Sequence, residues 1–421
     1  MFNRNRTAEK YDVIIVGGGM AGIGAAVGAA KAGAATLLID KNPYFGGTFT
    51  HSSVASICGL YTRNDQLEKA VGGVADELLT LIPTGMLDGP VRGRSGDAIV
   101  IADPEAMKVA LDQLLERNNV QTLLHTQFAQ SHVEQSIITE IECLDYGGAF
   151  QLSGKAYVDA SGDGNLAASA GAAFRVGDGD GHYQTGTLVM RIGGVKPDIL
   201  PDRDTLSAAI IQAKNAGVRL TKERGALMKL PGSGDWIAIF ADEAVDALDA
   251  RSLTAAETAA RKQAWHYLEL LRAHVPGFDN AYLLQTGPSI GIRESRHLDT
   301  EYTLTADDVL FGRRQPDGIA RGGWPVEVHP HPGAPMEYRE ILNQSYFDIP
   351  LRSLKPVGIT NLWCAGRMIG CDQTAFASVR VMGTAMATGQ AAGVAAAQYA
   401  RTGVTNIQAV REELLRQGAI L

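Results

Sequence analysis

Apolar runs alternate with a helical pattern at the start of the chain. Residues 13–16 are continuously apolar, which is typical of a central parallel strand that is covered on both faces. Residues 20–31 have the composition of a helix, with Gly33 placed to end it, and residues 36–39 form a second apolar run. The pattern therefore predicts a β-α-β unit as the first part of the fold.

The next part of the chain mixes helical and strand patterns. A helix over residues 104–117 is predicted, because Asp103 can cap it and a proline suits its first position. Residues 120–124 predict a strand, and alternating residues 136–141 predict a half-exposed antiparallel strand. With a further apolar strand at 155–160, the pattern indicates a hairpin-rich insert between two pieces of one sheet.

The pattern changes after residue 173 and changes back near residue 357. In between, charge increases and β-α-β signals become rare, while Thr254 and Glu257 have the spacing of a capping box for a long helix. Residues 361–365 then predict a strand and residues 375–400 a long helix of small residues. We therefore expect the end of the chain to return to the first sheet.

These elements predict an α/β fold made of two parts. A Rossmann-like nucleotide-binding domain, with helices on both faces of a parallel sheet, would comprise residues 1–173 and 357–421. An inserted α+β domain that faces the substrate would comprise residues 174–356.

Composition excludes several classes of partner. The net charge is -8 and no run of Lys and Arg forms a basic stripe, which argues against a nucleic-acid partner. Residues 1–10 are polar and lack the apolar core of a signal peptide, and no stretch is typical of a membrane span. The 4 cysteines form no CxxC pair and have no metal-ligand spacing, so we expect a cytoplasmic protein.

The first turn carries a dinucleotide-binding pattern. Gly17, Gly19 and Gly22 have the spacing GxGxxG between the first strand and the first helix. The glycines permit a tight turn, close approach of the backbone to a diphosphate, and close packing of the helix on the strand. Asp40, next to Lys41 at the end of the second strand, is placed to accept a hydrogen bond from a ribose hydroxyl. The pattern alone leaves both FAD and NAD open.

Four further stretches carry a family resemblance. They are DKNPYFGGTFTHSS, DASGDGNLAASAG, GIRESRHLDTEYTLTADDVLFGRRQPDGIARGGWPVEVH and WCAGRMIGCDQTAFASVRVMGTAMATGQAAG. These stretches resemble the FAD-dependent oxidoreductase family, which is distantly similar to flavoproteins of the fumarate reductase and glutathione reductase types. The resemblance covers nearly the whole chain, is weakest over residues 60–151 and 196–285, and implies FAD as the cofactor.

The resemblance also implies contacts to FAD beyond the first motif. The pair Gly46 and Gly47 would let a loop pass close to the cofactor, and the hydroxyl of Thr48 would reach it; a plain turn is the alternative. The backbone at Phe128 would contact the adenine. Around Asp163, a glycine-rich turn would close the same site, although a second nucleotide site is the alternative.

A late motif resembles the place where flavoproteins of this family meet the diphosphate. Gly366 would allow the approach, and Arg367 would add a charge-assisted bond to phosphate, unless it is an ordinary surface arginine. The helix that starts near residues 375–378, including Ser378, would aim its N-terminus at the flavin.

Candidate side chains for the chemistry lie on loops after these motifs. His51 can transfer a proton near neutral pH, or it is merely a polar loop residue. Arg293 and Arg296 would bind a substrate carboxylate, or they form ion pairs between domains. His329 and His331 flank a proline and lack further ligands, so we predict no metal.

We therefore expect an FAD-dependent oxidoreductase that performs two-electron chemistry on a small organic substrate held between the two domains. One alternative is a flavin-dependent monooxygenase that hydroxylates an aromatic or peptide-borne group. Another is a flavoprotein that passes electrons to a protein partner or helps it mature. The substrate and the oligomeric state are left open by the sequence.

Overall fold

The apolar strands pair in parallel in the computed structural model, which describes residues 10–93, 96, 98–199 and 201–421. Strand β1 (Lys10–Val16) lies between β2 (Thr36–Ile39) and β9 (Gly148–Asp159). Parallel pairing continues from β2 to β6 (Gln121–Leu123) and from β9 to β20 (Leu362–Cys364). The end of the chain therefore returns to the first sheet, as predicted. The segment 1–9, where we predict no signal peptide, lies outside the described residues.

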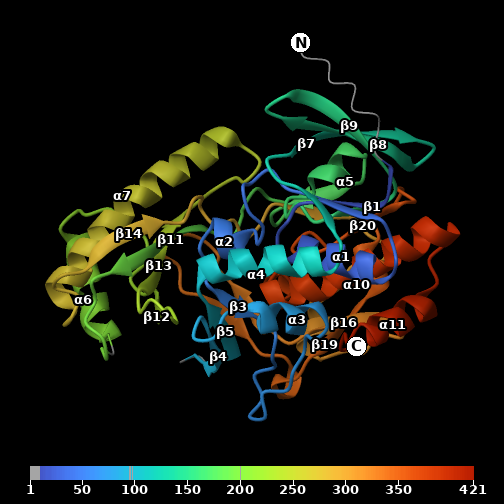
Figure 1. Cartoon of the computed structure of the whole chain (residues 1–421). Helices are drawn as coiled ribbons and strands as arrows, with labels where there is room; N and C mark the ends of the chain where they lie inside the picture. The colour runs from blue at the N-terminus through green and yellow to red at the C-terminus, as the bar shows by residue number, and fades with distance from the viewer. Residues whose placement is uncertain (1–9, 94–95, 97, 200) are drawn as a thin grey trace.

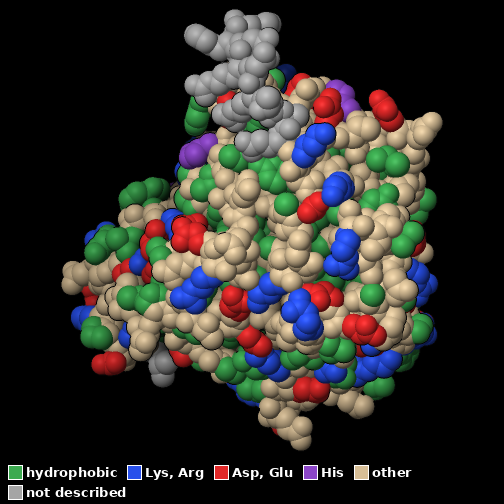
Figure 2. Space-filling view, turned by 45° about the vertical axis from the view of Figure 1, so that its right-hand side comes forward, with side chains coloured by type: hydrophobic (Ala, Val, Ile, Leu, Met, Phe, Trp, Pro, Cys, Tyr) green, Lys and Arg blue, Asp and Glu red, His purple; other side chains and the backbone are tan. Residues whose placement is uncertain are grey.

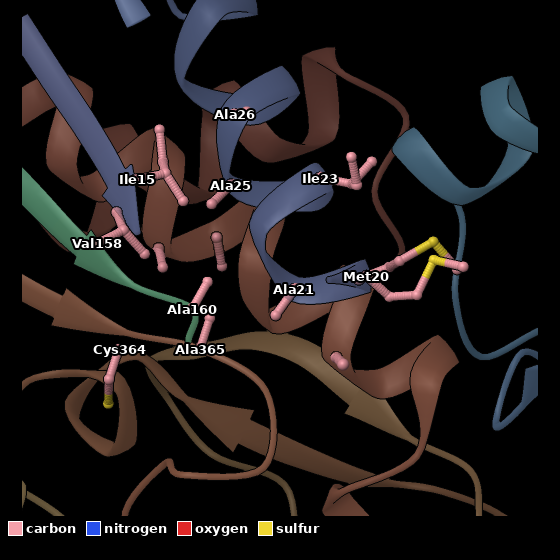
Figure 3. Packing of buried hydrophobic residues seen from close by; sticks show 14 of the residues in the cluster. Ile15, Met20, Ala21, Ile23, Ala25, Ala26, Val158, Ala160, Cys364 and Ala365 are labelled. Carbon is pink, nitrogen blue, oxygen red and sulfur yellow. The ribbon is translucent and has the colours of Figure 1, made fainter. Parts of the chain in front are cut away.

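Two helices of small residues cover one face of this sheet. Helix α1 (Met20–Lys31) packs along α10 (Met382–Thr402), and Figure 3 shows Ala21 and Ala25 of α1 on the side of Val158 and Ala160. A Cβ on Gly389 or Gly393 would lie 2.0 Å from a carbonyl oxygen of α1. Because a real Cβ never comes so close, these glycines let the two helix backbones touch.

An antiparallel hairpin extends the same sheet. Strands β7 (Gln127–Glu134) and β8 (Ile137–Asp145) pair with each other, and β8 pairs with the first half of β9. This is the predicted hairpin-rich insert. Phe128 lies within β7 rather than on a turn, opposite Cys143.

A second sheet lies beside the first (Figure 1, left). It is antiparallel, and its order is β12 (Ala226–Lys229), β13 (Trp236–Glu243), β11 (Gly186–Gly193) and β14 (Tyr282–Thr286). Helices α6 (Arg203–Asn215) and α7 (Ala250–His274) pack on it, and its buried side chains form a core of their own. The buried apolar residues from 298 to 354 belong to the core of the parallel sheet instead. The domain bounds 174 and 356 stay a prediction.

Shorter elements complete the fold. They are α2 (Thr48–His51), β3 (Ser56–Cys58), α3 (Val74–Leu81), β4 (Leu87–Arg92), β5 (Ala98–Ala102), α4 (Pro104–Arg117), α5 (Asn165–Ser169), β10 (Phe174–Val176), β15 (Arg296–Leu298), α8 (Ala306–Leu310), β16 (Gly318–Gly322), β17 (Val326–Val328), β18 (Glu337–Arg339), β19 (Phe347–Pro350), α9 (Gln373–Val379) and α11 (Ile407–Arg416), with 3-10 turns at Leu342–Gln344 and Leu351–Leu354.

Two predicted helix features are wrong in detail. The long helix α7 begins before the expected capping box: Asp249 caps it, and the Thr254 hydroxyl donates to the carbonyl oxygen of Ala250. The single helix expected over residues 375–400 is two helices, α9 and α10, which are separated at Arg380. Small residues favour a helix throughout this stretch, so composition alone did not reveal the break.

Charged side chains of both signs are interspersed on the face shown in Figure 2. Among the described residues, no helix is both long enough and apolar enough to cross a bilayer.

Candidate functional site

The carboxyl ends of the parallel strands open into one cleft of about 460 Å³. This edge of an open α/β sheet is where such folds bind ligands. Twelve of the predicted site residues line the cleft: Gly17, Gly19, Asp40, Lys41, Gly46, Gly47, Thr48, His51, Phe128, Asp163, Gly366 and Arg367. Four predicted residues do not line it: Gly22, Arg293, Arg296 and Ser378.

The glycines of the first turn have different reasons for lacking a side chain. Gly17 has a φ of +102°, and a Cβ there would lie 2.5 Å from the carbonyl oxygen of Ala160. A Cβ on Gly22 would lie 1.8 Å from the carbonyl oxygen of Gly17, so Gly22 permits the close packing of α1 on the turn. Gly19 is different, because its Cβ would meet only the Cα of Gly47, at 3.8 Å. Packing within the protein does not require a glycine at this position.

A second loop lies against this turn. The amide of Gly46 donates to the carbonyl oxygen of Gly18 over 2.8 Å, and Gly47 has a φ of +54°. A Cβ on Gly47 would lie 2.8 Å from the Cα of Gly19. The two loops therefore touch backbone to backbone, which leaves amide groups rather than side chains at the floor of the cleft.

Asp40 is bound to the backbone of both neighbouring loops. One carboxylate oxygen accepts from the amide of Gly18 at 2.6 Å, and the other accepts from the amide of Asn42 at 2.8 Å. A carboxylate oxygen has more than one acceptor direction, so Asp40 keeps capacity for a ribose hydroxyl. The neighbouring Lys41 is exposed at the rim of the cleft.

The turn after β9 is shaped by a buried carboxylate. Asp159 is fully buried and accepts from the amides of Ser161 and Ala167 at 3.0 and 2.8 Å. Burial raises the pKa of the Asp159 carboxyl. Ser161, Gly162 and Asp163 line the same cleft as the first glycine turn. This second glycine-containing turn therefore lines the same cleft as the first one, as expected for a single nucleotide site.

Arg367 is held by an ion pair that the sequence did not predict. Its Nη2 lies 2.8 Å from Oδ1 of Asp163, which also accepts from the hydroxyl of Ser295 at 2.8 Å. Its Nη1 is buried and has no hydrogen-bond partner in the part of the chain that the structure describes. A buried donor without a partner costs free energy, so Nη1 is available for a ligand in the cleft.

The helix that starts at the cleft is α10, not α9. Ser378 is fully buried, does not line the cleft, and its hydroxyl donates to the carbonyl oxygen of Trp324, so its position does not support the predicted cofactor contact. The N-terminus of α9 is capped by Asp372 instead. Met382, the first residue of α10, lines the cleft, and no described side chain caps this helix start. The positive end of the α10 dipole therefore faces the cleft.

His51 lies in the cleft at the end of α2. Its ring lies 6.0 Å from that of Tyr44, and its Nδ1 is buried without a partner among the residues described. Burial lowers the pKa of the imidazole, which outweighs the opposing effect of Asp40. The ring is therefore neutral at neutral pH.

The predicted arginine pair divides between two places. Arg296 donates to the carbonyl oxygen of Asp163 at 2.8 Å and to the side chain of Asn165 at 3.0 Å, so it supports the glycine turn from outside. The suggestion that Arg296 binds substrate is not supported by this position. Arg293 donates through Nη1 to the hydroxyl of Thr187 at 2.7 Å.

The structure adds residues to the cleft that the sequence did not single out as site residues. Leu253 and Glu257 reach it from α7, Ile290 and Ile292 from the loop between β14 and β15, and Arg380 from the break between α9 and α10. The carboxylate of Glu257 accepts from the amide of Ile290 at 2.6 Å. The hydrophobic pattern of the sequence gives no sign of a helix break at this position, so the sequence did not place Arg380 at the cleft.

His329 does not belong to a metal cluster. It lies 3.1 Å from Oε1 of Glu327, whereas His331 is exposed. No group of three or more His, Cys, Asp or Glu side chains with metal-binding geometry occurs among the described residues.

A parallel sheet with a glycine-lined cleft at its carboxyl edge is typical of nucleotide-binding folds. The chain matches the family described as FAD dependent oxidoreductase over residues 12–417, and it therefore belongs to this family. This confirms the predicted resemblance, the FAD cofactor and the oxidoreductase class.

One curated relative matches over a short stretch. It is the 3-oxosteroid 1-dehydrogenase of Mycolicibacterium smegmatis (strain ATCC 700084 / mc(2)155), which is 38% identical over 66 residues. The match covers 16% of this chain and 11% of the dehydrogenase.

The solved structures to which the chain is similar include the following two. A geranylgeranyl bacteriochlorophyll reductase-like protein from Thermoplasma acidophilum is 13% identical, with 98% of this chain and 84% of that chain covered and a TM-score of 0.49. A flavocytochrome c3 fumarate reductase is 15% identical, with 93% and 79% covered and a TM-score of 0.43.

The residues of the cleft fit FAD. At Gly19, the space that a side chain would occupy is free of described protein atoms closer than 3.8 Å. Helices α1 and α10 begin at the cleft, and no described side chain caps either helix start. Helix starts of this kind bind phosphate through their unpaired amides. The unpartnered Nη1 of Arg367 adds a charged donor. Gly17, Gly19, Gly46, Gly47 and Arg367 would hold the diphosphate.

Proposed function

We propose that the chain catalyses a two-electron oxidation or reduction of a small organic substrate. The substrate would bind where the cleft meets the second sheet. One observation carries this proposal: a single cleft is lined both by the glycine turns and by Leu253, Glu257 and Ile290 near the second sheet. Sites at the boundary between two cores are common locations for substrate binding.

Bound FAD supplies the electron acceptor or donor. The protein then has to hold the substrate, exclude water and move a proton. Ile290 and Ile292 supply apolar surface to the cleft, and the hydrogen bond from the Ile290 amide to Glu257 ties this loop to α7. The loop therefore stays in place over the substrate side of the cleft.

His51 is the residue that we assign to proton transfer. Its ring lines the cleft and its buried Nδ1 has no partner in the described part of the chain, so it can accept a proton from a substrate. Because burial keeps the imidazole neutral, the accepting form dominates at neutral pH.

The test is turnover by the purified, FAD-loaded chain. Small alcohols and saturated acids would be screened as electron donors under anaerobic conditions, with bleaching of the flavin absorbance as the measurement, and enones would be screened as electron acceptors after photoreduction. Bleaching by at least one donor, followed by reoxidation with an artificial acceptor, is expected. No bleaching by any donor, and no substrate reduction after photoreduction, would contradict the proposal.

The same experiment separates the alternatives. A monooxygenase would show a transient absorbance of a flavin oxygen adduct when the reduced protein meets oxygen, together with a hydroxylated product. A protein that serves a partner would turn over only when a stoichiometric partner is added. Turnover by the isolated chain without an oxygenated product would favour the proposed function over both.

A further inference from the structure

Residues 287–291 form a loop at the substrate side of the cleft, where Ser289 and Ile290 line it. Both ends of the 287–291 loop are bound to β11. The amide of Gly287 donates to one carbonyl oxygen of this strand at 2.9 Å, and the amide of Gly291 donates to another at 2.8 Å. Backbone hydrogen bonds to the second sheet therefore fix where the loop begins and ends.

The middle of the 287–291 loop is held by two other elements. The amide of Ser289 donates to the carbonyl oxygen of His51, the last residue of α2, at 3.1 Å. The amide of Ile290 donates to Oε1 of Glu257 on α7 at 2.6 Å. The remaining residue of the loop is a proline, which has no amide hydrogen. Every amide of the loop thus has an acceptor, and only that of Ile290 depends on a side chain.

The carboxylate of Glu257 is largely shielded from water. The side chain is 19% exposed and lines the cleft. Its Oε2 lies 3.0 Å from Nη1 of Arg261, whose own side chain is half exposed, so water screens the charge of this partner. Because Asp249 caps α7, Glu257 has no part in the capping box expected from the sequence. Its negative charge is therefore free to act inside the cleft.

Four charged groups on three sides of the cleft act on the ring of His51. They are Asp40 and Lys41 after β2, Lys108 on α4 and Glu257 on α7. Burial has the largest effect and lowers the pKa of the imidazole, the two carboxylates raise it, and the two lysines lower it. Of the two carboxylates, Glu257 is the one that is also linked to the backbone of His51, through consecutive residues of the 287–291 loop.

We infer, on the basis of the proposed function, that Glu257 is a positioning residue of the active site. Its carboxylate holds the 287–291 loop against the backbone of His51. Its charge stabilises the imidazolium that forms when His51 takes up a proton from the substrate. The two effects can be separated by substitution, because glutamine keeps an oxygen that accepts from Ile290 but carries no charge.

Titration of the His51 ring by NMR tests the effect of the charge. The FAD-loaded protein would carry isotope-labelled histidine, and His51→Asn would assign the signal among the 9 histidines. The pKa of His51 should be lower in Glu257→Gln than in the wild type, because a charge that favours the imidazolium is gone. Glu269→Gln removes an exposed carboxylate of the same helix and should leave this pKa unchanged. An identical pKa of His51 in Glu257→Gln and the wild type would overturn the inference.

Hydrogen exchange of the 287–291 loop tests the anchoring. In Glu257→Ala, the amide of Ile290 loses its acceptor and should exchange about tenfold faster or more, whereas Glu257→Gln should stay close to the wild-type rate. Exchange in Glu257→Ala as slow as in the wild type would show that Glu257 does not hold the loop. Loss of FAD from Glu257→Gln would also contradict the inference, because Glu257 is assigned no contact to the cofactor.

Neither measurement needs a substrate, so both are independent of the screen for electron donors. A screen without any bleaching would count against the proposed function and would leave the titration and the exchange rates as they are. With a substrate from the screen, the acidic limb of kcat/KM should move to lower pH in Glu257→Gln and stay in place in Glu269→Gln. A limb that stays in place in Glu257→Gln would contradict the inference.

Discussion

The guanidinium of Arg367 and the carboxylate of Asp163 form an ion pair across the cleft, with 2.8 Å between Nη2 and Oδ1. The pair joins the turn after β20 to the turn after β9, and it leaves Nη1 of Arg367 buried without a partner among the described residues. Holding a long side chain in one orientation reduces the entropy that FAD binding would otherwise cost.

We predict that Arg367→Met weakens FAD binding about ten- to hundredfold, because a charged hydrogen bond contributes about 1.5–3 kcal/mol. Asp163→Ala should weaken it less, since the charge of Arg367 remains. Flavin fluorescence titration measures both. The control is Arg352→Met, which breaks a comparable ion pair to Asp317 outside the cleft and should leave the FAD affinity unchanged.

Gly19 is predicted to matter for FAD and not for folding. Gly19→Val should remove the yellow colour of the purified protein, because a side chain holds the diphosphate away from the backbone. Its Cβ would meet only the Cα of Gly47, at 3.8 Å, so the melting temperature of the FAD-free protein should stay the same. Full flavin absorbance in the purified variant would contradict this placement of the cofactor.

Gly393 is predicted to have the opposite effect. A Cβ at this position would lie 2.0 Å from the carbonyl oxygen of Ala25, so Gly393→Ala must push α10 away from α1. We expect a loss of about 1–3 kcal/mol in the free energy of unfolding, the usual cost of overpacking a core. Urea unfolding of the FAD-free protein measures it; an unchanged midpoint would show that the helices are not in close contact.

His51 is predicted to set the acidic limb of the pH–rate profile. Its neutral form accepts the proton, so kcat/KM should fall as the pH drops through the lowered pKa of the imidazole and stay flat above 6.5. His51→Asn should lower kcat by a factor of about 10²–10⁴ and remove this limb. His331→Asn, an exposed histidine, is the control. An acidic limb that persists in His51→Asn would assign the proton transfer elsewhere.

His329 is predicted to make the fold sensitive to acid. Its pKa is lowered from 6.5 to about 3 by burial, so below pH 6.5 the unfolded chain binds a proton that the folded chain does not. Stability should therefore fall as the pH drops, by up to about 1.4 kcal/mol per pH unit from this group.

His329→Gln should remove this contribution while keeping a donor for Glu327. Urea unfolding between pH 4.5 and 6.5 isolates it, because the unfolded carboxylate of Glu327 protonates mainly below pH 4.5. Curves of wild type and variant that stay parallel over this range would show that His329 is protonated in the folded protein.

The first β-α-β unit could be predicted closely from the sequence. The helix over residues 20–31 and the strand over 36–39 were found within the bounds that the structure has, since apolar runs and glycine turns are local signals. The break between α9 and α10 was not predicted, because alanines, which favour a helix, recur on both sides of Arg380. The start of the helix at the cleft was therefore expected too early, at residues 375–378.

The resemblance of the sequence to a known family implied FAD. The patterns of the sequence by themselves determined the nucleotide-binding fold and twelve of the residues that line the cleft. These follow from local requirements: a turn that needs glycine, a strand that needs apolar side chains, and an acid at a strand end. Only the tertiary structure decided which charges meet. Asp163 and Arg367 lie far apart in the chain, and nothing in their local sequence encodes the distance between them. Their pairing depends on how β9 and β20 come together in the sheet, which is a property of packing and not of pattern.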